Sequence, residues 1–130
     1  MPTDNLPSNV RDFLNRFIRS VEQLEILLLV SARGELAWSA AQVYDVILSS
    51  ESSVARWLEE LTRARLLVRE AESPSCFRAS DDPAVAEQIA ALRHAYKTVP
   101  TRLIEAIYKR DVDAVQGFAD AFKIKEPRAE

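Results

Sequence analysis

The feature that most constrains the fold is the segment 24–30, which is apolar on almost every side. Leu24 is followed closely by the unbroken apolar run Ile26–Val30. A helix with apolar side chains all round is stable only when other elements cover all of its faces. Residues 26–30 fall far short of the roughly 20 apolar residues that a membrane-spanning helix needs. The segment therefore predicts a central, buried helix in a globular domain.

The residues before this segment predict another helix with a single apolar side. Ser20 and Gln23 form a capping-box pattern that predicts a helix start at residue 21. Because the apolar side nearly continues in phase across this point, one bent helix is the alternative to two helices. Apolar residues at three- and four-residue spacing define the earlier helix, namely Val10, Phe13, Leu14, Phe17 and Ile18.

Serine-rich turns divide the middle of the chain. Ser39 and Gln42 form a second capping box, which predicts the start of a short helix. We expect this helix to end at Ser49 and Ser50, because serine favours turns and caps over helix interiors. A longer helix is expected over residues 51–64, where apolar residues again recur at three- and four-residue spacing.

Two short apolar runs follow this longer helix. Residues 66–70 and 76–79 have the length and composition of strands. Between them, residues 72–75 contain the proline and serines that are typical of turns. The pattern predicts a β-hairpin.

A long apolar seam occupies the C-terminal part of the chain. Asp82 and Pro83 mark a helix start, and Pro100 predicts a kink or break. We expect the seam to form a homodimer interface, and the alternative is that it packs on residues 10–18 of its own chain. The seam has the narrow spacing of a coiled coil and consists of Val85, Ile89, Leu92, Tyr96, Val99 and Leu103.

These elements predict a mainly α fold with four parts. Residues 1–19 form an N-terminal helix, and residues 20–80 form a helix-turn-helix with a short β-hairpin. Residues 81–123 form C-terminal helices, and residues 124–130 form a polar, mobile tail.

The order of elements from residue 21 to residue 79 resembles a winged helix-turn-helix domain. Residues 39–69 are similar to the segment of MarR- and PadR-like bacterial regulators that holds both helices of the helix-turn-helix and the start of the wing. Arg65 stands where the family usually has glycine, at the turn from helix to wing. The family's apolar positions are filled by Leu58, Leu61, Leu66 and Val68.

The resemblance implies sequence-specific binding of duplex DNA and transcriptional regulation as a homodimer. In the family, the second helix lies in the major groove, and the wing touches the backbone or the minor groove. Arginine suits guanine edges and phosphates, and serine hydroxyls suit phosphates. The positions carried over are Ser52, Ser53, Arg56 and Arg63 on the helix, and Arg69, Ser73, Ser75 and Arg78 on the wing.

The charge of this segment leaves a second function open. Residues 51–80 contain five arginines and five glutamates, whereas a DNA-reading surface normally carries a positive stripe. DNA binding is favoured if Glu59 and Glu60 lie on the opposite side of the helix, and they directly follow the inward-facing Leu58. The alternative is a winged helix that binds another protein and no DNA.

Composition excludes several kinds of site. Two glycines are too few for the glycine-rich loops that hold phosphates in nucleotide sites. One histidine and one cysteine exclude a Cys/His zinc site and an intrachain disulfide. We therefore expect no cofactor. The single thiol, Cys76, and the lack of a secretory signal in residues 1–8 favour a cytoplasmic protein that is not anchored in a membrane.

Catalysis is poorly supported by the sequence. His94 lies within an expected helix and has no recognisable nucleophile motif around it. The carboxylate pairs Asp81-Asp82 and Asp111/Asp113 stand at expected helix starts, where the helix dipole favours acids. We expect a binding protein and no enzyme.

Overall fold

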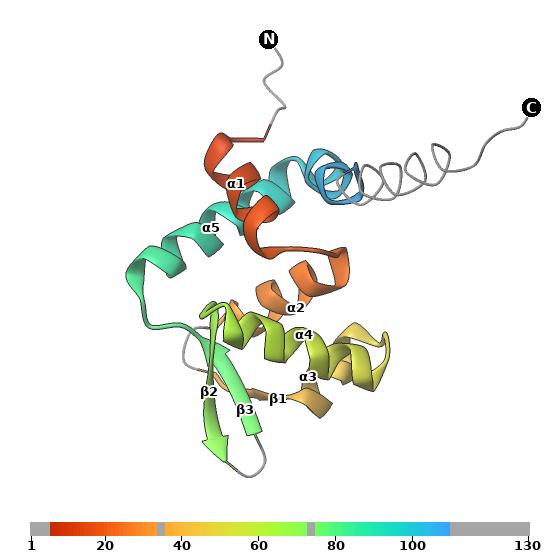
Figure 1. Ribbon diagram of the computed structural model, residues 1–130, viewed down its shortest axis with the longest axis vertical. Coiled ribbons are helices and arrows are strands. Elements are labelled where there is room, and N and C mark those ends of the chain that lie inside the picture. Colours follow the sequence, from red (N-terminus) through yellow and green to blue (C-terminus); the bar gives the residue numbers. More distant parts are fainter. Residues whose placement is uncertain (1–5, 34–35, 73–74, 110–130) are drawn as a thin grey trace, which may run out of the picture.

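The computed structural model describes residues 6–33, 36–72 and 75–109 (Figure 1). Residues 100–109 are helical in addition to the labelled elements. Within the described ranges, no helix is long and apolar enough to cross a membrane. The labelled elements are α1 (Ser8–Phe17), α2 (Val21–Ser31), β1 (Trp38–Ser39), α3 (Ala40–Ile47), α4 (Glu51–Arg63), β2 (Leu67–Glu72), β3 (Ser75–Ala79) and α5 (Pro83–Thr98).

The predicted fold class is confirmed: the chain is mainly helical and carries a small antiparallel sheet. The strand order is β1-β3-β2, so the hairpin β2–β3 is joined at one edge by the two residues of β1. Trp38 pairs with Phe77 across β1 and β3. Leu67 pairs with Ala79 across the hairpin, and the register shifts between Arg69 and Glu72. In Figure 1 the hairpin points away from α1 and α5.

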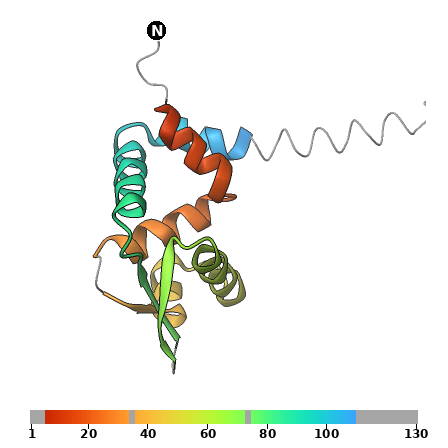
Figure 2. The same cartoon turned by 60° about the vertical axis from the view of Figure 1, so that its left-hand side comes forward.

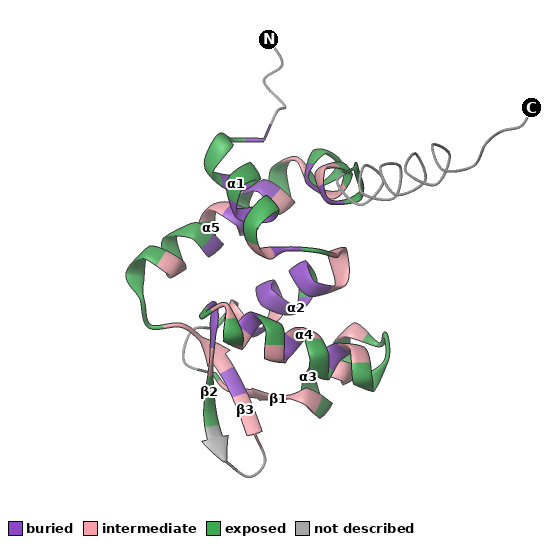
Figure 3. Ribbon diagram, viewed as in Figure 1, coloured by how far each residue is buried: buried purple, intermediate pink, exposed green. Residues whose placement is uncertain are grey.

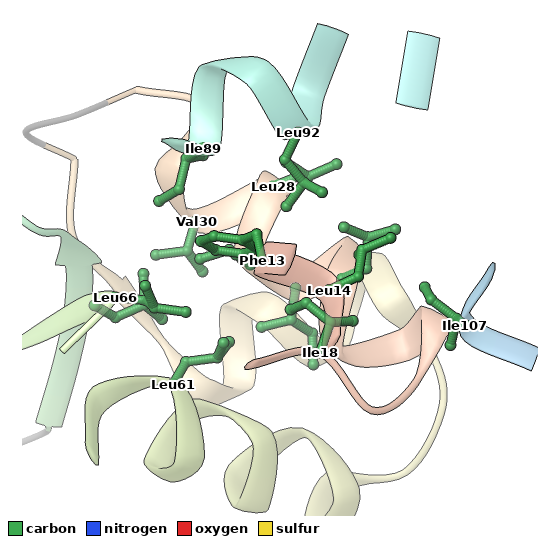
Figure 4. Packing of buried hydrophobic residues seen from close by; sticks show 14 of the residues in the cluster. Phe13, Leu14, Ile18, Leu28, Val30, Leu61, Leu66, Ile89, Leu92 and Ile107 are labelled. Carbon is green, nitrogen blue, oxygen red and sulfur yellow. The ribbon is translucent and has the colours of Figure 1, made fainter. Parts of the chain in front are cut away.

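The apolar helix predicted near residue 25 is α2, and it lies at the centre of the fold. Its side chains at Leu24, Ile26, Leu27 and Val30 have no exposed surface. It contacts α3, α4, α5 and β3. Figure 3 shows α2 buried along most of its length, and Figure 4 shows side chains of α1, α4 and α5 converging around it. The burial of α2 therefore joins the hairpin end of the molecule to the α1–α5 end.

Two separate helices, and not one bent helix, precede the short strand. The Ser20 hydroxyl accepts a hydrogen bond from the Gln23 backbone N–H at 3.0 Å, which caps α2 as predicted. The buried Gln23 amide accepts from the Arg19 N–H at 2.6 Å and donates to the Phe17 carbonyl at 3.0 Å. One side chain thus satisfies backbone groups at the end of α1 and the start of α2.

The helix-turn-helix has the predicted caps but an unexpected turn. Ser39 and Gln42 make both hydrogen bonds of the predicted capping box, at 3.2 and 2.9 Å. Ser50 caps α4 by accepting from the Ser53 N–H at 3.1 Å. Between the helices, Leu48 has φ 59° and ψ 34°, the left-handed conformation that usually favours glycine. Its side chain is 69% exposed.

The turn from α4 to β2 is left-handed although it contains no glycine. Arg65 adopts φ 68°, in the left-handed region. Its N–H donates to the Thr62 carbonyl, and the Leu66 N–H donates to the Leu61 carbonyl, both at 2.9 Å. This pair of bonds is the Schellman arrangement, in which the left-handed residue is usually glycine. Leu61 and Leu66 are both buried and add the apolar contact that accompanies it.

The C-terminal seam packs largely on its own chain. Ile89, Leu92 and Leu103 are buried in one cluster with residues of α1 and α2, and α5 contacts α1 directly. Pro100 begins the helical segment 100–109 after a break at Val99, which has φ −135° and ψ 58°. This placement fits the alternative in which the seam covers the first helix, so these three side chains offer no surface to a second chain.

The remaining seam residues are half-buried. Val85, Tyr96 and Val99 pack against the cluster but keep some exposed surface. Burial and a 3.0 Å hydrogen bond from the Tyr96 hydroxyl to Glu25, with burial the larger cause, raise the pKa of Tyr96 above its usual value. Homodimerisation stays a prediction.

The proposed division into parts also stays a prediction. Side chains from residues 1–19, 20–80 and 81–109 share one hydrophobic cluster. The expected tail, residues 124–130, lies outside the described residues.

Replacement of Arg65 by glycine tests the left-handed turn. We expect Arg65→Gly to stabilise the fold by about 1 kcal/mol, because a residue with a Cβ pays a steric penalty in this conformation that glycine does not. Urea denaturation measures the change. Arg65→Ala is the matched control, since it removes the same charge but keeps the Cβ. Equal stabilities of the two variants would contradict this explanation.

Replacement of Leu92 tests the intrachain packing of the seam. We expect Leu92→Ala to lower the free energy of unfolding by about 2–5 kcal/mol, because it leaves a cavity in the core. The exposed neighbour His94, changed to alanine, should alter it by less than about 0.5 kcal/mol. Denaturation at several protein concentrations is the measurement. A loss that vanishes on dilution would instead indicate that Leu92 packs between chains.

Candidate nucleic-acid interface

Helix α4 has one side in the core and one side in solvent. Val54, Leu58 and Leu61 are buried beneath it. The opposite side carries residues at spacings of four, three and four, which brings them onto one helical face. In order, these residues are Ser52, Arg56, Glu59 and Arg63. We call them the outer face of α4.

Arg56 is the arginine of this face that no carboxylate holds. Its guanidinium carbon lies 4.7 Å from the centre of the Trp57 ring, a cation–π distance. Among the described residues, Arg56 has no ion-pair partner. Its charge is therefore available to an anion outside the chain.

The two predicted serines of α4 lie differently. Ser52 is exposed on the outer face. Ser53 is half-buried, and its hydroxyl donates to Glu22 at the start of α2, with oxygen–oxygen distances of 2.8 Å. Ser49 in the preceding turn donates to the same carboxylate at 2.5 Å. Glu22 thus links the turn between α3 and α4 to α2. The Ser53 hydroxyl already donates its hydrogen bond to this carboxylate.

Arg63 on the outer face and Arg69 on the hairpin are each paired with a carboxylate of α4. Arg63 lies 3.4 Å from Glu60, and its side chain is 71% exposed. Arg69, on β2, lies 2.5 Å from Glu59. Arg69 also donates to the Ser75 hydroxyl at 3.2 Å. These contacts link the hairpin to α4.

A hollow of about 470 Å³ lies where α4 meets the hairpin. The Glu59–Arg69 pair lines it, together with Ser75 and the small side chains Ala41 and Ala55. The predicted hairpin residue Ser75 therefore lies at the same place as Arg69. Ser73 lies outside the described residues.

Arg78 on β3 contacts two carboxylates, more than Arg56, Arg63 or Arg69 does. Its two terminal nitrogens donate to the two oxygens of Asp81 at 2.9 and 3.2 Å, and its Nε lies 3.3 Å from Glu70. Its side chain is only 19% exposed. The hydrogen bond to Asp81 is the main cause that raises the pKa of Arg78 above its usual value. Arg78 thus joins the hairpin to the start of α5.

Glu59 and Glu60 do not lie on the far side of α4 from the arginines. Glu59 belongs to the outer face, and Glu60 is close enough to pair with Arg63. The physical reason is the helical repeat, because position 59 is three residues after Arg56 and four before Arg63. The arginine-bearing surface is therefore interrupted by carboxylates.

Several residues of the site were not expected from the sequence. Glu22 was missed because its serine partners are 27 and 31 residues away. The role of Glu59 had a local signal, since its spacing from Arg56 and Arg63 already places it on their face. Within the described ranges, no group of three His, Cys, Asp or Glu side chains is arranged to hold a metal ion.

Comparisons with known proteins show the fold. No family model matches the sequence, and no curated protein sequence matches it. Among solved structures, MepR of Staphylococcus aureus in a DNA complex is similar over 83% of this chain and 90% of that chain. The TM-score is 0.55 and the identity 13%. MepR is a transcription regulator of the multidrug efflux pump MepA.

A second similar structure is a MarR family transcriptional regulator from Silicibacter pomeroyi. The match covers 88% of this chain and 85% of that chain, with a TM-score of 0.54 and 16% identity. At these identities the likeness concerns the fold. The predicted resemblance is confirmed in that sense: the chain has the winged helix-turn-helix fold of MarR-family regulators.

Proposed function

We propose that the protein binds duplex DNA in a sequence-specific way and regulates transcription. In this proposal α4 enters the major groove and the β2–β3 hairpin contacts the backbone or minor groove beside it. The observation that carries the proposal is the solvent-facing side of α4, where Ser52 is exposed and Arg56 has no carboxylate partner among the described residues. The similarity in fold to MepR, whose structure was solved with DNA, supports it.

The proposed contacts differ in strength. Arg56 is free to reach a guanine edge or a phosphate, because no carboxylate among the described residues competes for it. Arg63 and Arg69 must first leave a carboxylate, and Arg78 would have to leave two. Ser52 and Ser75 remain candidate phosphate donors, whereas Ser53 would have to give up its bonds to Glu22.

A second candidate function is a protein-interaction module that binds no DNA. The specific observation that favours it is the pairing of Arg63, Arg69 and Arg78 with carboxylates, which leaves a surface with little net positive charge. Nonspecific DNA binding depends on neutralising phosphates with free cations. One measurement distinguishes the two functions: the first predicts salt-dependent binding to DNA, and the second predicts none.

Homodimerisation is part of the first proposal. Helix-turn-helix readers engage two half-sites one helical turn apart, which a two-fold dimer matches. Since Ile89, Leu92 and Leu103 are buried in their own chain, the half-buried Val85, Tyr96 and Val99 are the seam residues that can still contribute to an interface.

Arg56 provides the test of DNA binding. We expect the wild-type protein to bind a labelled random duplex in fluorescence anisotropy, with affinity that falls as salt rises. Arg56→Ala should weaken binding several-fold and make the slope of log K against log salt shallower by about 0.9, the loss of one phosphate contact.

The control for this test is Arg11→Ala. Arg11 is exposed on α1, at the end of the molecule away from the hairpin (Figure 1), so the variant loses the same charge at a distance. The absence of salt-dependent binding, both to random duplex and to duplexes selected from genomic fragments, would favour the protein-interaction module.

Light scattering tests the homodimer. We expect a mass of twice the 14.7 kDa of one chain, and Val85→Asp should lower it towards one chain because a buried charge disfavours the interface. Ala84→Asp is the matched control, since residue 84 is exposed beside it. A wild-type mass of one chain at micromolar concentrations would contradict the dimer.

A further inference from the structure

Glu59 is a carboxylate of the proposed reading surface, which is the outer face of α4 together with the β2–β3 hairpin beside it. It lies on the outer face of α4, between Arg56 and Arg63 in the helical repeat, and its side chain is 47% exposed. Its Oε2 lies 2.5 Å from a terminal nitrogen of Arg69 on β2. The position therefore puts a negative charge where DNA would approach, and it links the two elements that would contact DNA.

Arg69 is held by more than this ion pair. A terminal nitrogen donates to the Ser75 hydroxyl at 3.2 Å, and the guanidinium carbon lies 5.1 Å from the centre of the Phe77 ring. The guanidinium is thus fixed against β3 by one hydroxyl and one ring, and against α4 by Glu59. By comparison, Arg63 and Glu60 form an exposed pair within one helix turn, a type that contributes little.

Glu59 has unequal effects on the two kinds of DNA contact. Sequence-independent binding comes from cations that neutralise phosphates and release counterions. An arginine already paired with a carboxylate brings no net charge to a phosphate. A base edge is different, because a carboxylate can accept a hydrogen bond from the amino group of cytosine in the major groove. Glu59 should therefore oppose phosphate binding without opposing base reading.

We propose that Glu59 is a specificity-determining residue, which suppresses sequence-independent DNA binding by keeping Arg69 paired in the free protein. The proposal rests on the DNA-binding function proposed above. Separating Glu59 from Arg69 costs free energy. In a DNA site that offers suitable base edges to α4, the new hydrogen bonds offset this cost, whereas random duplex offers no such bonds. The difference between specific and random affinity therefore depends on Glu59.

The test compares Glu59→Gln with two controls of equal charge. Glu60→Gln removes the same charge next to it on α4, and Glu87→Gln removes it from the exposed surface of α5. With random duplex, we expect Glu59→Gln to bind several-fold more tightly and to steepen the slope of log K against log salt by about 0.9, one additional phosphate contact. Glu87→Gln should leave both unchanged, and Glu60→Gln should have the smaller effect.

A double variant tests whether the gain passes through Arg69. In the Arg69→Ala background, Glu59→Gln should no longer raise affinity, because no arginine is released. For duplexes selected from a random library by the wild-type protein, Glu59→Gln should lower the ratio of selected to random affinity. Circular dichroism and urea denaturation confirm that each variant is folded.

The outcomes separate this inference from the proposed function. If Arg56→Ala weakens DNA binding but Glu59→Gln matches Glu87→Gln, the role of Glu59 is overturned and DNA binding stands. If the gain persists in the Arg69→Ala background, Glu59 acts by its charge alone and the pairing proposal is overturned. If neither the wild type nor Glu59→Gln shows salt-dependent binding, the DNA-binding function and this inference both fall.

Discussion

The burial of α2 is the constraint on which the rest of the fold depends. A helix that is apolar on almost every side must have most of its surface covered. The elements α3, α4, α5 and β3 contact α2, and Glu25 stays exposed. Figure 2 shows α2 between the α1–α5 end of the molecule and the hairpin end. This packing decides which side of α4 faces inward, since Val54, Leu58 and Leu61 fill the space next to α2. The composition of the proposed reading surface is therefore a consequence of core packing.

Because core packing determines which residues of α4 face inward, the helical repeat determines which residues form its outer face. Arg56 and Glu59 follow one another on that face, so a positive and a negative charge are presented together. The hairpin then lies close enough for Arg69 to reach Glu59. A surface of this kind has little net charge although it holds several arginines. Its affinity for DNA therefore depends on which of those arginines are free, more than on how many there are.

Much of the fold, and less of the site, is predictable from the sequence. Periodicity and capping residues predict the helices, because Ser20, Ser39 and the Pro100 break act on neighbouring residues only. The partner of Arg69 is not predictable in this way, because it depends on the distance between α4 and the hairpin. The seam that includes Leu92 illustrates the same limit, since an apolar stripe does not reveal whether its own chain or another covers it. Arg65 is visible in the sequence only as a missing glycine, because no local pattern shows that an arginine adopts the left-handed conformation there.

The two left-handed turns show how the fold keeps its geometry in a chain with two glycines. A left-handed residue other than glycine costs about 1–2 kcal/mol. At Arg65 this penalty is offset by two 2.9 Å backbone hydrogen bonds and by the burial of Leu61 and Leu66. The same turn determines where β2 begins relative to α4, and hence whether Arg69 can reach Glu59. Because core packing holds this strained turn in place, the core determines how the hairpin is aligned with α4. Substitutions on the outer face of α4 can therefore change the charge of the surface while leaving its geometry intact.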